Sequence, residues 1–432
     1  MRIDAMRLWL LWSCAPAAAI QSAYQNLSSA LSECGQGQRG LACALNCQEE
    51  EPGLAESFEP WWDHQMPWQL LFDVCERVAG IATQVFLGAV LEHKVVYRCC
   101  SNDCDPGKLI DPATDVDILL GLVSELANIK ALSDMVFLFN TGDQPFVDKM
   151  YWSPLPVLHW VKSDGHWSVP LPNPYHLSAH VKNLLGDFAG HHENHIPWVK
   201  KIPKVFWRGS LSAPDRFMVE AAGTLPRVRL MKLAKDHPDL FDVGITNLDR
   251  ELYKFIGVSQ AKHLLQSLGG KVQREDFQAV MPRYRYLVNV AAVLSSWRLA
   301  EMLATGSVLL LQEGSDRELM MEWLTPWVHY VPISAGLSDL VQKVRWLEAH
   351  PVEAEAIAKR GFQLFSQRVR RQDTLCYLWQ VLRAVANTQK APQREELFSR
   401  TRDWQQARPD LLTHIDGFTS LRDIMSPSSA EL

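Results

Sequence analysis

Two stretches in the first third of the chain carry apolar residues at helical spacing. The first runs from residue 61 to about residue 96, and the second covers residues 115–132. The second leads into a short apolar run, 135–140, which ends at a turn-forming sequence over 141–145. A short apolar run closed by a turn predicts a buried strand that opens into a loop. A helix, a buried strand and a loop in this order are typical of α/β proteins.

The second half of the chain repeats this alternation. Strands are predicted at residues 204–210, 286–290, 307–312 and 327–333, and helices at 296–305, 337–350, 352–370 and 373–387. Gly306 directly follows the first of these helices, where a glycine often caps a helix C-terminus. Strands that alternate with helices indicate a parallel sheet, whose ligands bind at the carboxyl ends of the strands. From Thr388 on the chain is polar, and we expect this tail to be peripheral.

Composition narrows the function classes. The chain has 432 residues, 43 Lys and Arg against 49 Asp and Glu, and a net charge of −6, which argues against a protein that coats nucleic acid through its phosphates. With 47% hydrophobic and 21% charged residues, the chain is globular and long enough for two domains with a sizeable core. These figures fit an enzyme-sized protein.

The first 20 residues have the pattern of a secretory signal peptide. A short basic region is followed by an apolar stretch that ends in small residues, Ala17 to Ala19. The stretch is shorter than the roughly 20 apolar residues that span a bilayer. An N-terminal anchor or a buried helix is the alternative. We therefore expect no membrane span after signal removal, and a location in the lumen of the endoplasmic reticulum or Golgi, or outside the cell.

The cysteines support an oxidising compartment. Nine are present, at positions 14, 34, 43, 47, 75, 99, 100, 104 and 376. Removal of the signal would leave eight, seven of them before residue 105, so we expect disulfides within a cysteine-rich N-terminal region. The spacings Cys43-x3-Cys47 and Cys100-x3-Cys104 leave a zinc site as the alternative.

Three short segments of the second half are suited to binding an anion. Arg208-Gly-Ser210 ends a predicted strand, Pro214-Asp-Arg216 begins a candidate helix, and Ser296-Trp-Arg298 stands at another predicted helix start. Guanidinium groups and free backbone N–H groups at helix starts together bind a nucleotide diphosphate. Lys200, Lys201 and Lys204 add positive charge nearby. The Gly-rich fingerprints of P-loop and dinucleotide-binding proteins are missing from the sequence.

Two further clusters invite a catalytic interpretation. Asp143 stands after the predicted strand 135–140, a favoured place for a catalytic group, although Gly-Asp-x-Pro is also an ordinary turn sequence. His191, His192 and His195 suggest a zinc hydrolase. They lack the His-Glu-x-x-His order, and the flanking Gly190 and Pro197 disfavour the helix that would hold the ligands.

Longer motifs resemble a known family. They are Phe206-Trp-Arg-Gly-Ser210, Asn289-x6-Ser296-Trp-Arg298, Ala304-Thr-Gly-Ser307 and Pro326-Trp-Val-His-Tyr-Val-Pro332. The chain is similar, over roughly residues 125–388, to glycosyltransferase family 90, which contains protein O-glucosyltransferases and capsule-associated xylosyltransferases. The run 286–332 is the most specific part of this resemblance.

The resemblance implies a GT-B fold, in which two Rossmann-like domains face a central cleft. Together with the signal pattern and the cysteines, it divides the chain into a signal peptide (1–20), a cysteine-rich region (21–110), an N-terminal domain with the catalytic base (111–203), a UDP-sugar domain ending in a closing helix (204–388) and a polar tail (389–432). The implied reaction is metal-independent and inverting. It moves glucose or xylose from a UDP-sugar to a hydroxyl of a protein or glycan acceptor, and UDP-glucose or UDP-xylose is a co-substrate rather than a cofactor.

The resemblance also assigns residues. Asp143 matches the family's Asn-x-x-Asp-x-Pro base motif, which starts here at Asn140. The UDP-sugar would be bound by Arg208, Ser210, Arg216, Val293, Leu294, Ser295, Ser296, Trp297 and Arg298. The chain departs from the family at Val290-Ala-Ala292, where a glycine is usual. A non-catalytic glycoprotein- or sugar-binding member of the fold is therefore the alternative function.

Overall fold

The computed structural model shows two compact units. The first combines residues 1–192 with residues 369–432, and the second contains residues 193–368. The described residues are 47, 54–61, 65–78, 84–100, 115–128, 132–142, 145, 147–173, 196–212, 225–249, 252–253, 256–291, 298–368 and 371–407. The predicted signal peptide lies outside them.

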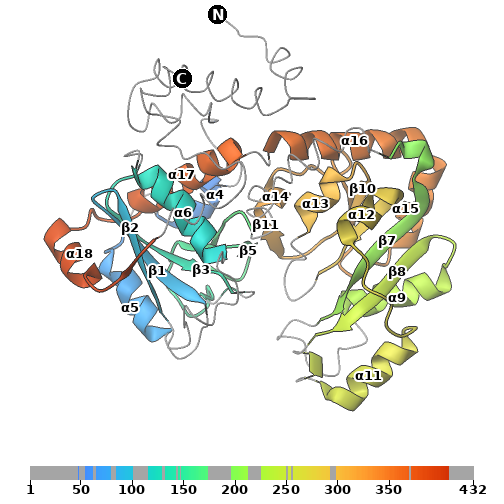
Figure 1. The fold of residues 1–432 in the computed structure, drawn as a ribbon, viewed down its shortest axis with the longest axis horizontal. Helices are drawn as coiled ribbons and strands as arrows, with labels where there is room; N and C mark the ends of the chain where they lie inside the picture. The colour runs from blue at the N-terminus through green and yellow to red at the C-terminus, as the bar shows by residue number, and fades with distance from the viewer. Residues whose placement is uncertain are drawn as a thin grey trace, which may run out of the picture. The chain divides into compact units, whose positions relative to one another are not determined.

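The first unit is built on a mixed sheet, to which the described residues contribute six strands (Figure 1). The order is β13 (Gln405–Gln406), β2 (Lys94–Cys99), β1 (Val85–Leu91), β3 (Met135–Asn140), β4 (Val157–His159) and β6 (Ser168–Pro170). Strand β1 is antiparallel to β2 and β3, whereas β3, β4 and β6 are parallel. The strand predicted at 135–140 is confirmed. The antiparallel half of the sheet departs from the Rossmann-like domain predicted here.

Strands β1 and β2 form a hairpin in a region whose sequence pattern predicts a helix, residues 61–96. Helix α5, Gln69–Arg77, occupies only part of that region. All seven residues of β1 are buried, and a short continuous apolar run has no period that separates a strand from a buried helix. The helical prediction is therefore wrong from residue 85 onward.

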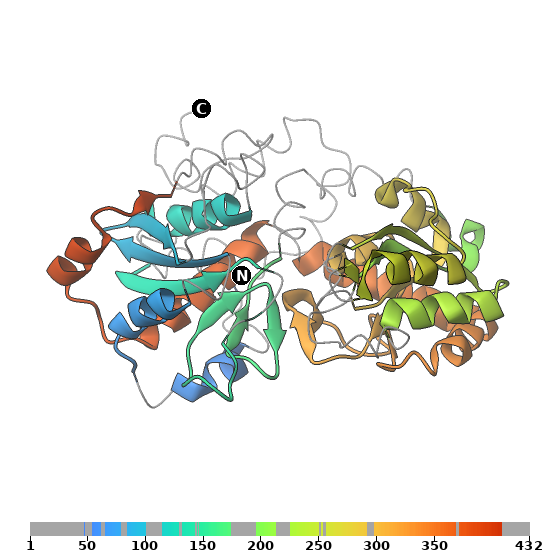
Figure 2. The same ribbon diagram turned by 90° about the horizontal axis from the view of Figure 1, so that it is seen from below.

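Helices cover both faces of the first sheet, as Figures 1 and 2 show. On one face, α5 and α18 (Arg394–Thr401) bury apolar side chains against β1 and β3. On the other face lie α6 (Asp115–Asn128), as predicted, and α17 (Arg371–Asn387), which contacts both α6 and β3. The short helices α4 (Leu54–Phe58) and η1 (Glu59–Trp61) precede α5.

The C-terminal part of the chain belongs to the first unit, contrary to two predictions. The family resemblance places helix α17 in the second domain, yet its Tyr377 hydroxyl donates to the carbonyl of Pro170, in the first unit, at 2.6 Å. Residues 389–407 are not a peripheral tail, because Leu397 is fully buried and the ring of Trp404 lies 5.4 Å from that of Phe72. A few apolar side chains in a polar segment suffice to dock it, and their contacts lie far away in the sequence.

Two disulfides lie among the described residues. Cys75 is bonded to Cys100, within the region predicted to be cysteine-rich, and Cys47 is bonded to Cys376 on α17. The prediction of disulfides is thus confirmed for these four cysteines. The zinc alternative is wrong for Cys47 and Cys100, whose sulfurs are used in disulfides, and the connection from residue 47 to α17 was not anticipated.

The second unit contains a parallel sheet, and five of its strands are described. Their order is β12 (Val331–Ile333), β10 (Val308–Gln312), β9 (Tyr284–Asn289), β7 (Ile202–Leu211) and β8 (Phe241–Leu248), with every neighbouring pair parallel. Numbered along the chain this is the doubly wound order 2-1-3-4-5, which reverses direction between β7 and β9. The strands predicted at 204–210, 286–290 and 307–312 are confirmed. Strand β8 was missed, and the run 327–333 forms a strand only over its last three residues.

Helices connect these strands and follow the last of them. They are α9 (Pro226–Asp236), α11 (Val258–Ser267), α12 (Phe277–Val280), η5 (Met281–Arg283), α13 (Leu299–Ala304), α14 (Leu319–Glu322), α15 (Leu340–Ala349) and α16 (Pro351–Arg368). Gly306 has a φ of 62° just after α13, which confirms the predicted C-cap. Gly361 lets α16 approach closely, because a Cβ there would lie 2.7 Å from the carbonyl oxygen of His329. None of the helices among the described residues is both long and apolar enough to cross a membrane.

Candidate functional site

The carboxyl edge of the second sheet is the natural place for a ligand. Doubly wound sheets bind ligands outside the carboxyl ends of the strands, at the point where the strand order reverses. That point lies here between β7 and β9. The chain leaves β7 through Ser210, Leu211 and Ser212, and it leaves β9 through Asn289 and Val290. Ser210, one of the residues predicted to bind the UDP-sugar, is therefore at the expected position.

Arg227 supplies a buried positive charge at this edge. It stands in the first turn of α9 and is 4% exposed. Its Nη1 donates to the Ser210 carbonyl at 2.6 Å and to the Ser212 hydroxyl at 2.8 Å, and its guanidinium lies over the Trp207 ring. Burial, and then the charge of Arg298, lower the pKa of Arg227, whereas Asp249 raises it. Because a guanidinium remains charged in proteins, Arg227 places a buried positive charge at this edge.

Arg298 reaches the same strand from the other side of the reversal point. It is the N-cap residue of α13, and its Nη1 donates to the Arg208 carbonyl at 3.0 Å. Its guanidinium also lies 4.3 Å from the centre of the Phe277 ring. The structure therefore brings together Ser210 and Arg298, two of the residues predicted to bind the UDP-sugar. It adds Arg227 to them.

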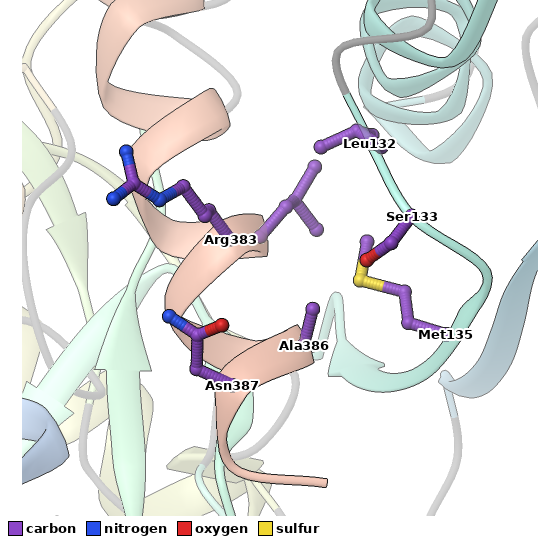
Figure 3. Close-up of a pocket in the computed structure, with 7 residues that line it drawn as sticks. Leu132, Ser133, Met135, Arg383, Ala386 and Asn387 are labelled. Atoms are coloured by element: carbon purple, nitrogen blue, oxygen red, sulfur yellow. The ribbon is translucent and has the colours of Figure 1, made fainter. Parts of the chain in front are cut away.

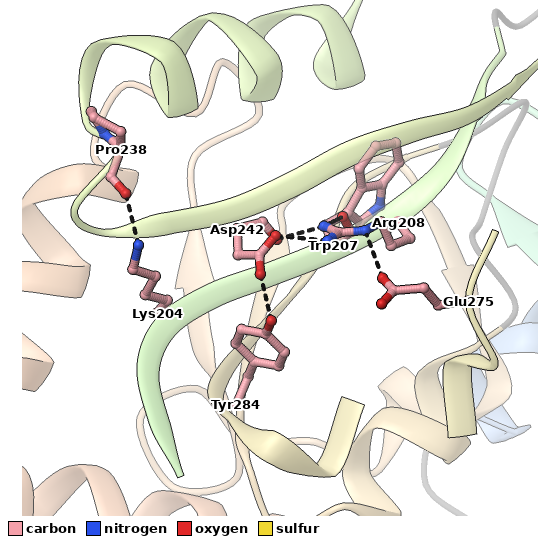
Figure 4. Close-up of polar contacts among 7 residues, drawn as sticks. All are labelled: Lys204, Trp207, Arg208, Pro238, Asp242, Glu275 and Tyr284. Atoms are coloured by element: carbon pink, nitrogen blue, oxygen red, sulfur yellow. Dashed lines mark hydrogen bonds and ion pairs between the residues drawn. The ribbon is translucent and has the colours of Figure 1, made fainter. Parts of the chain in front are cut away.

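Arg208, a third residue predicted to bind the UDP-sugar, forms ion pairs with two carboxylates (Figure 4). Its Nη2 lies 2.7 Å from Asp242 Oδ1, its Nε lies 3.2 Å from Glu275 Oε2, and its side chain is 12% exposed. Asp242 pairs in register with Phe206, two residues before Arg208. The guanidinium consequently turns back along the strand, away from the carboxyl edge. A contact between Arg208 and a diphosphate stays a prediction.

A tyrosine completes the group around Arg208. The Tyr284 hydroxyl donates to the second oxygen of Asp242. Burial, together with the neighbouring carboxylate, raises the pKa of Tyr284 to about 12. Burial opposes ionisation of Asp242, but hydrogen bonds from Tyr284 and Arg208 outweigh it and lower the pKa of Asp242. Asp242 is thus held as an anion, and it fixes the side chain of Arg208.

Two of the three lysines that the sequence suggested, Lys201 and Lys204, do not add charge to the carboxyl edge. Lys204 donates to the carbonyl of Pro238 at 2.9 Å, near the amino end of the sheet. Lys201 precedes β7 and is 2% exposed, with its ammonium directed at oxygens of the protein. Both lysines precede Arg208 by several residues of extended chain. They therefore lie toward the amino end of the strand and away from its carboxyl end.

Gln312 joins two segments that line the carboxyl edge. It is the last residue of β10; its Oε1 accepts from the Ala291 N–H at 2.8 Å, and its Nε2 donates to the Ala335 carbonyl at 2.6 Å. Ala291 belongs to the Val290-Ala-Ala292 departure from the family pattern. The side-chain amide thus fixes the backbone at the point where this chain differs.

Other predicted residues lie outside the described part of the chain. They are Asp143, Arg216, Val293, Leu294, Ser295, Ser296 and Trp297, and also His191, His192 and His195. The backbone just before Asp143 is described: the Gly142 N–H donates to Asn140 Oδ1 at 2.9 Å, and its carbonyl oxygen lies 3.0 Å from His159 Nε2. These contacts fix the chain at the carboxyl end of β3. His159, buried beside this turn, was not singled out from the sequence.

Two other features of the described residues bear on further sites. Nowhere among them do three or more His, Cys, Asp or Glu side chains form a group that could hold a metal ion. A small pocket in the first unit lies between α17 and the segment that enters β3, and it includes Ser133, Met135 and Asn387 (Figure 3). It adjoins the amino end of β3, opposite to the end that leads to Asp143.

Two known proteins are similar to this chain in sequence. Human protein O-glucosyltransferase 3 is 27% identical over 366 residues, which are 83% of this chain and 66% of that protein. Protein O-glucosyltransferase 2 of Danio rerio is 30% identical over 264 residues, 60% of this chain and 48% of that protein. The chain thus spans less than two thirds of the length of either relative.

Solved structures overlap only weakly. Anabaena HepE in complex with UDP gives a TM-score of 0.33 at 11% identity, covering 64% of this chain and 76% of that one. A glycosyltransferase from Rickettsia africae gives 0.34 at 11% identity, covering 66% and 83%. The family assignment rests instead on the family model for glycosyl transferase family 90, which matches residues 113–401. This match includes both arginines of the carboxyl edge, and the chain belongs to glycosyl transferase family 90.

Proposed function

We propose that this protein is a metal-independent, inverting glycosyltransferase that moves glucose or xylose from a UDP-sugar to a hydroxyl of a protein or glycan. One observation carries the proposal. Arg227 and Arg298, from two different helices, each donate to a backbone carbonyl of β7 beside the reversal point of a doubly wound sheet, inside the family-matched region. Paired guanidiniums at this point suit a nucleotide diphosphate.

The donor site would use Ser210, Arg227 and Arg298, together with the motif residues Arg216 and 293–297. Arg227 was not predicted, and it is the better supported of the two arginines after β7 because its contacts with Ser210 and Ser212 are described. Arg208 would act mainly by positioning, since its carbonyl accepts from Arg298 while its guanidinium is engaged by Asp242 and Glu275.

The chemistry follows from these charges. Asp143 would accept the proton of the acceptor hydroxyl as its oxygen attacks the anomeric carbon, and the bond to UDP would break on the opposite face. One displacement inverts the anomeric centre. Arg227 and Arg298 would stabilise the charge that grows on the departing diphosphate, a task that a metal ion performs in metal-dependent transferases. In a GT-B enzyme of this kind, the first unit carries the base and the second unit holds the donor.

The cysteines support a compartment for the reaction. Disulfides such as Cys47–Cys376 and Cys75–Cys100 form and persist in oxidising compartments. Together with the signal pattern at residues 1–20, they support an enzyme of the secretory pathway, in the endoplasmic reticulum or Golgi lumen. Its acceptor would then be a secreted or membrane-bound protein, or a glycan on such a protein.

A calorimetric titration with UDP in the presence of EDTA tests the donor site. We expect saturable binding, because the site supplies its own cations. Folded protein that does not bind UDP would contradict the proposal. Incubation with UDP-glucose or UDP-xylose then separates the enzyme from the non-catalytic alternative: slow release of UDP by solvolysis, accelerated by an acceptor, supports transfer, and UDP binding without either supports a binder.

A further inference from the structure

We propose that Lys201 is a positioning residue for the donor site, because its buried ammonium joins the two segments that hold Arg298. The inference rests on the proposed function. It concerns a residue that does not touch the carboxyl edge and that acts through α13 and through the segment α12–η5. Neither the family motifs nor the chemistry of transfer requires a cation at this place.

The surroundings of Lys201 are unusual for a lysine. The residue is 2% exposed, and its Nζ donates to the carbonyls of Pro282 at 2.7 Å and Thr305 at 3.0 Å, and to the Ser307 hydroxyl at 3.0 Å. These three bonds use all three ammonium protons. All three partners are neutral oxygens. A buried charge of this kind is costly, so its hydrogen bonds must hold these segments in one arrangement.

The first segment leads directly to Arg298. Thr305 is the C-cap residue of α13, and Arg298 is the N-cap residue of the same helix. A cation at the C-terminal end of a helix interacts favourably with its free carbonyls. Because α13 has only six residues, its whole length is about 9 Å, and fixing one end largely fixes the other.

The second segment supports the side chain of Arg298. Pro282 belongs to η5, which directly follows α12, and α12 begins at Phe277. The Phe277 ring lies 4.3 Å from the Arg298 guanidinium and 5.7 Å from the Phe206 ring of β7. Lys201 therefore ties together the helix that carries Arg298 and the segment whose ring supports its guanidinium.

A third bond extends this arrangement into the sheet. The Ser307 hydroxyl accepts from Lys201 and donates to the Tyr284 carbonyl at 2.7 Å. Tyr284 is the first residue of β9, and Ser307 immediately precedes β10. The amino ends of three neighbouring strands, β7, β9 and β10, are thus connected through one ammonium group.

The test compares Lys201→Met with Lys204→Met. Lys204 lies in the same part of the chain, and its only described hydrogen bond is to the carbonyl of Pro238. The first measurement is hydrogen–deuterium exchange of the unliganded proteins, at a temperature where near-UV circular dichroism shows both folded. We expect faster exchange in peptides covering 277–283 and 299–306 for Lys201→Met only. Unchanged exchange in these peptides would overturn the inference, whatever the affinity for UDP.

The second measurement is a double-mutant cycle on UDP affinity. Lys201→Met should lower the affinity for UDP about tenfold in the wild-type background. In an Arg298→Ala background it should lower that affinity less than about twofold, because its effect passes through Arg298. Affinity for uridine, which lacks the diphosphate, should not change. Equal weakening in both backgrounds would show a role that does not pass through Arg298, and would overturn the proposal.

Two further outcomes are separable. Wild-type protein that does not bind UDP removes the proposed function, and with it the donor-site role of Lys201. If Lys201→Met does not fold, Lys201→Gln takes its place in both measurements, because its neutral amide has two N–H groups and ends one bond short of the ammonium position, so that it cannot make all three hydrogen bonds. In that variant, wild-type exchange over 299–306 would contradict the inference.

Discussion

Arg227 and Arg298 hold the same strand by the same atom: Nη1 of Arg227 donates to the Ser210 carbonyl, and Nη1 of Arg298 donates to the Arg208 carbonyl. They arrive from α9 and α13, on the two sides of the point where the strand order reverses. Their like charges repel, which contributes to the lowered pKa of Arg227. An anion bound at this edge would relieve the repulsion, so the two residues should favour an anionic ligand over a neutral one.

The first prediction concerns Arg227 itself. Arg227→Met should weaken UDP binding at least tenfold, or by about 1.4 kcal/mol or more, because a charged two-point donor is lost. Affinity for uridine should change much less. Lys232→Met, which removes an exposed lysine from the same helix, is the matched control and should bind UDP like the wild type. Wild-type UDP affinity in folded Arg227→Met would exclude the residue from the donor site.

The second prediction separates binding from chemistry. Asp143→Asn should leave the UDP dissociation constant within about twofold of the wild type, while transfer falls by about 10²–10⁴-fold, the usual contribution of a general base. Calorimetry and a coupled assay for released UDP measure the two quantities on one preparation. Transfer at the wild-type rate would rule out Asp143 as the base.

The third prediction distinguishes two roles of Arg208. If the side chain is a positioning group, Arg208→Met should lower stability by about 1–3 kcal/mol, because Asp242 is left without its guanidinium partner. The carbonyl that Arg298 uses remains, so UDP affinity should fall less than in Arg298→Ala. Urea denaturation and UDP titration give both numbers. UDP affinity that falls as far as in Arg298→Ala would show that Arg208 leaves Asp242 and binds the diphosphate, as its motif predicts.

Local patterns in the sequence were sufficient for part of this picture. Strands β3 and β10 are short apolar runs closed by turn residues, and the glycine at 306 marks the end of α13. The helix predicted at 296–305 correctly placed Arg298 at a helix start, where it is the N-cap residue of α13. These features depend on neighbours within a few residues, which a single sequence displays.

The remaining features depend on distant residues. Asp242 and Glu275 neutralise Arg208 from 34 and 67 residues away, and the sequence around Arg208 contains no sign of them. Arg227 follows Leu225-Pro226, an ordinary helix start, and its burial comes from packing against Trp207 and Ser212. The docking of residues 389–407 depends likewise on α5 and β2. Long-range contacts of this kind are not encoded in local periodicity or motif spacing.

The last prediction uses the titration of Lys201. Burial lowers the pKa of Lys201 to about 8 from its ordinary 10.5, so above pH 8 the unfolded chain binds a proton that the folded chain has lost. The free energy of unfolding therefore rises with pH between about 8 and 10.5, by a total of about 3 kcal/mol from this group. Below pH 8 the cost of the buried charge is present in full. Lys201→Met should lack this rise, whereas Lys204→Met should keep it. Urea unfolding of the three proteins at pH 7.0 and pH 10.0 measures the difference, and parallel pH dependences of wild type and Lys201→Met would contradict a depressed lysine pKa.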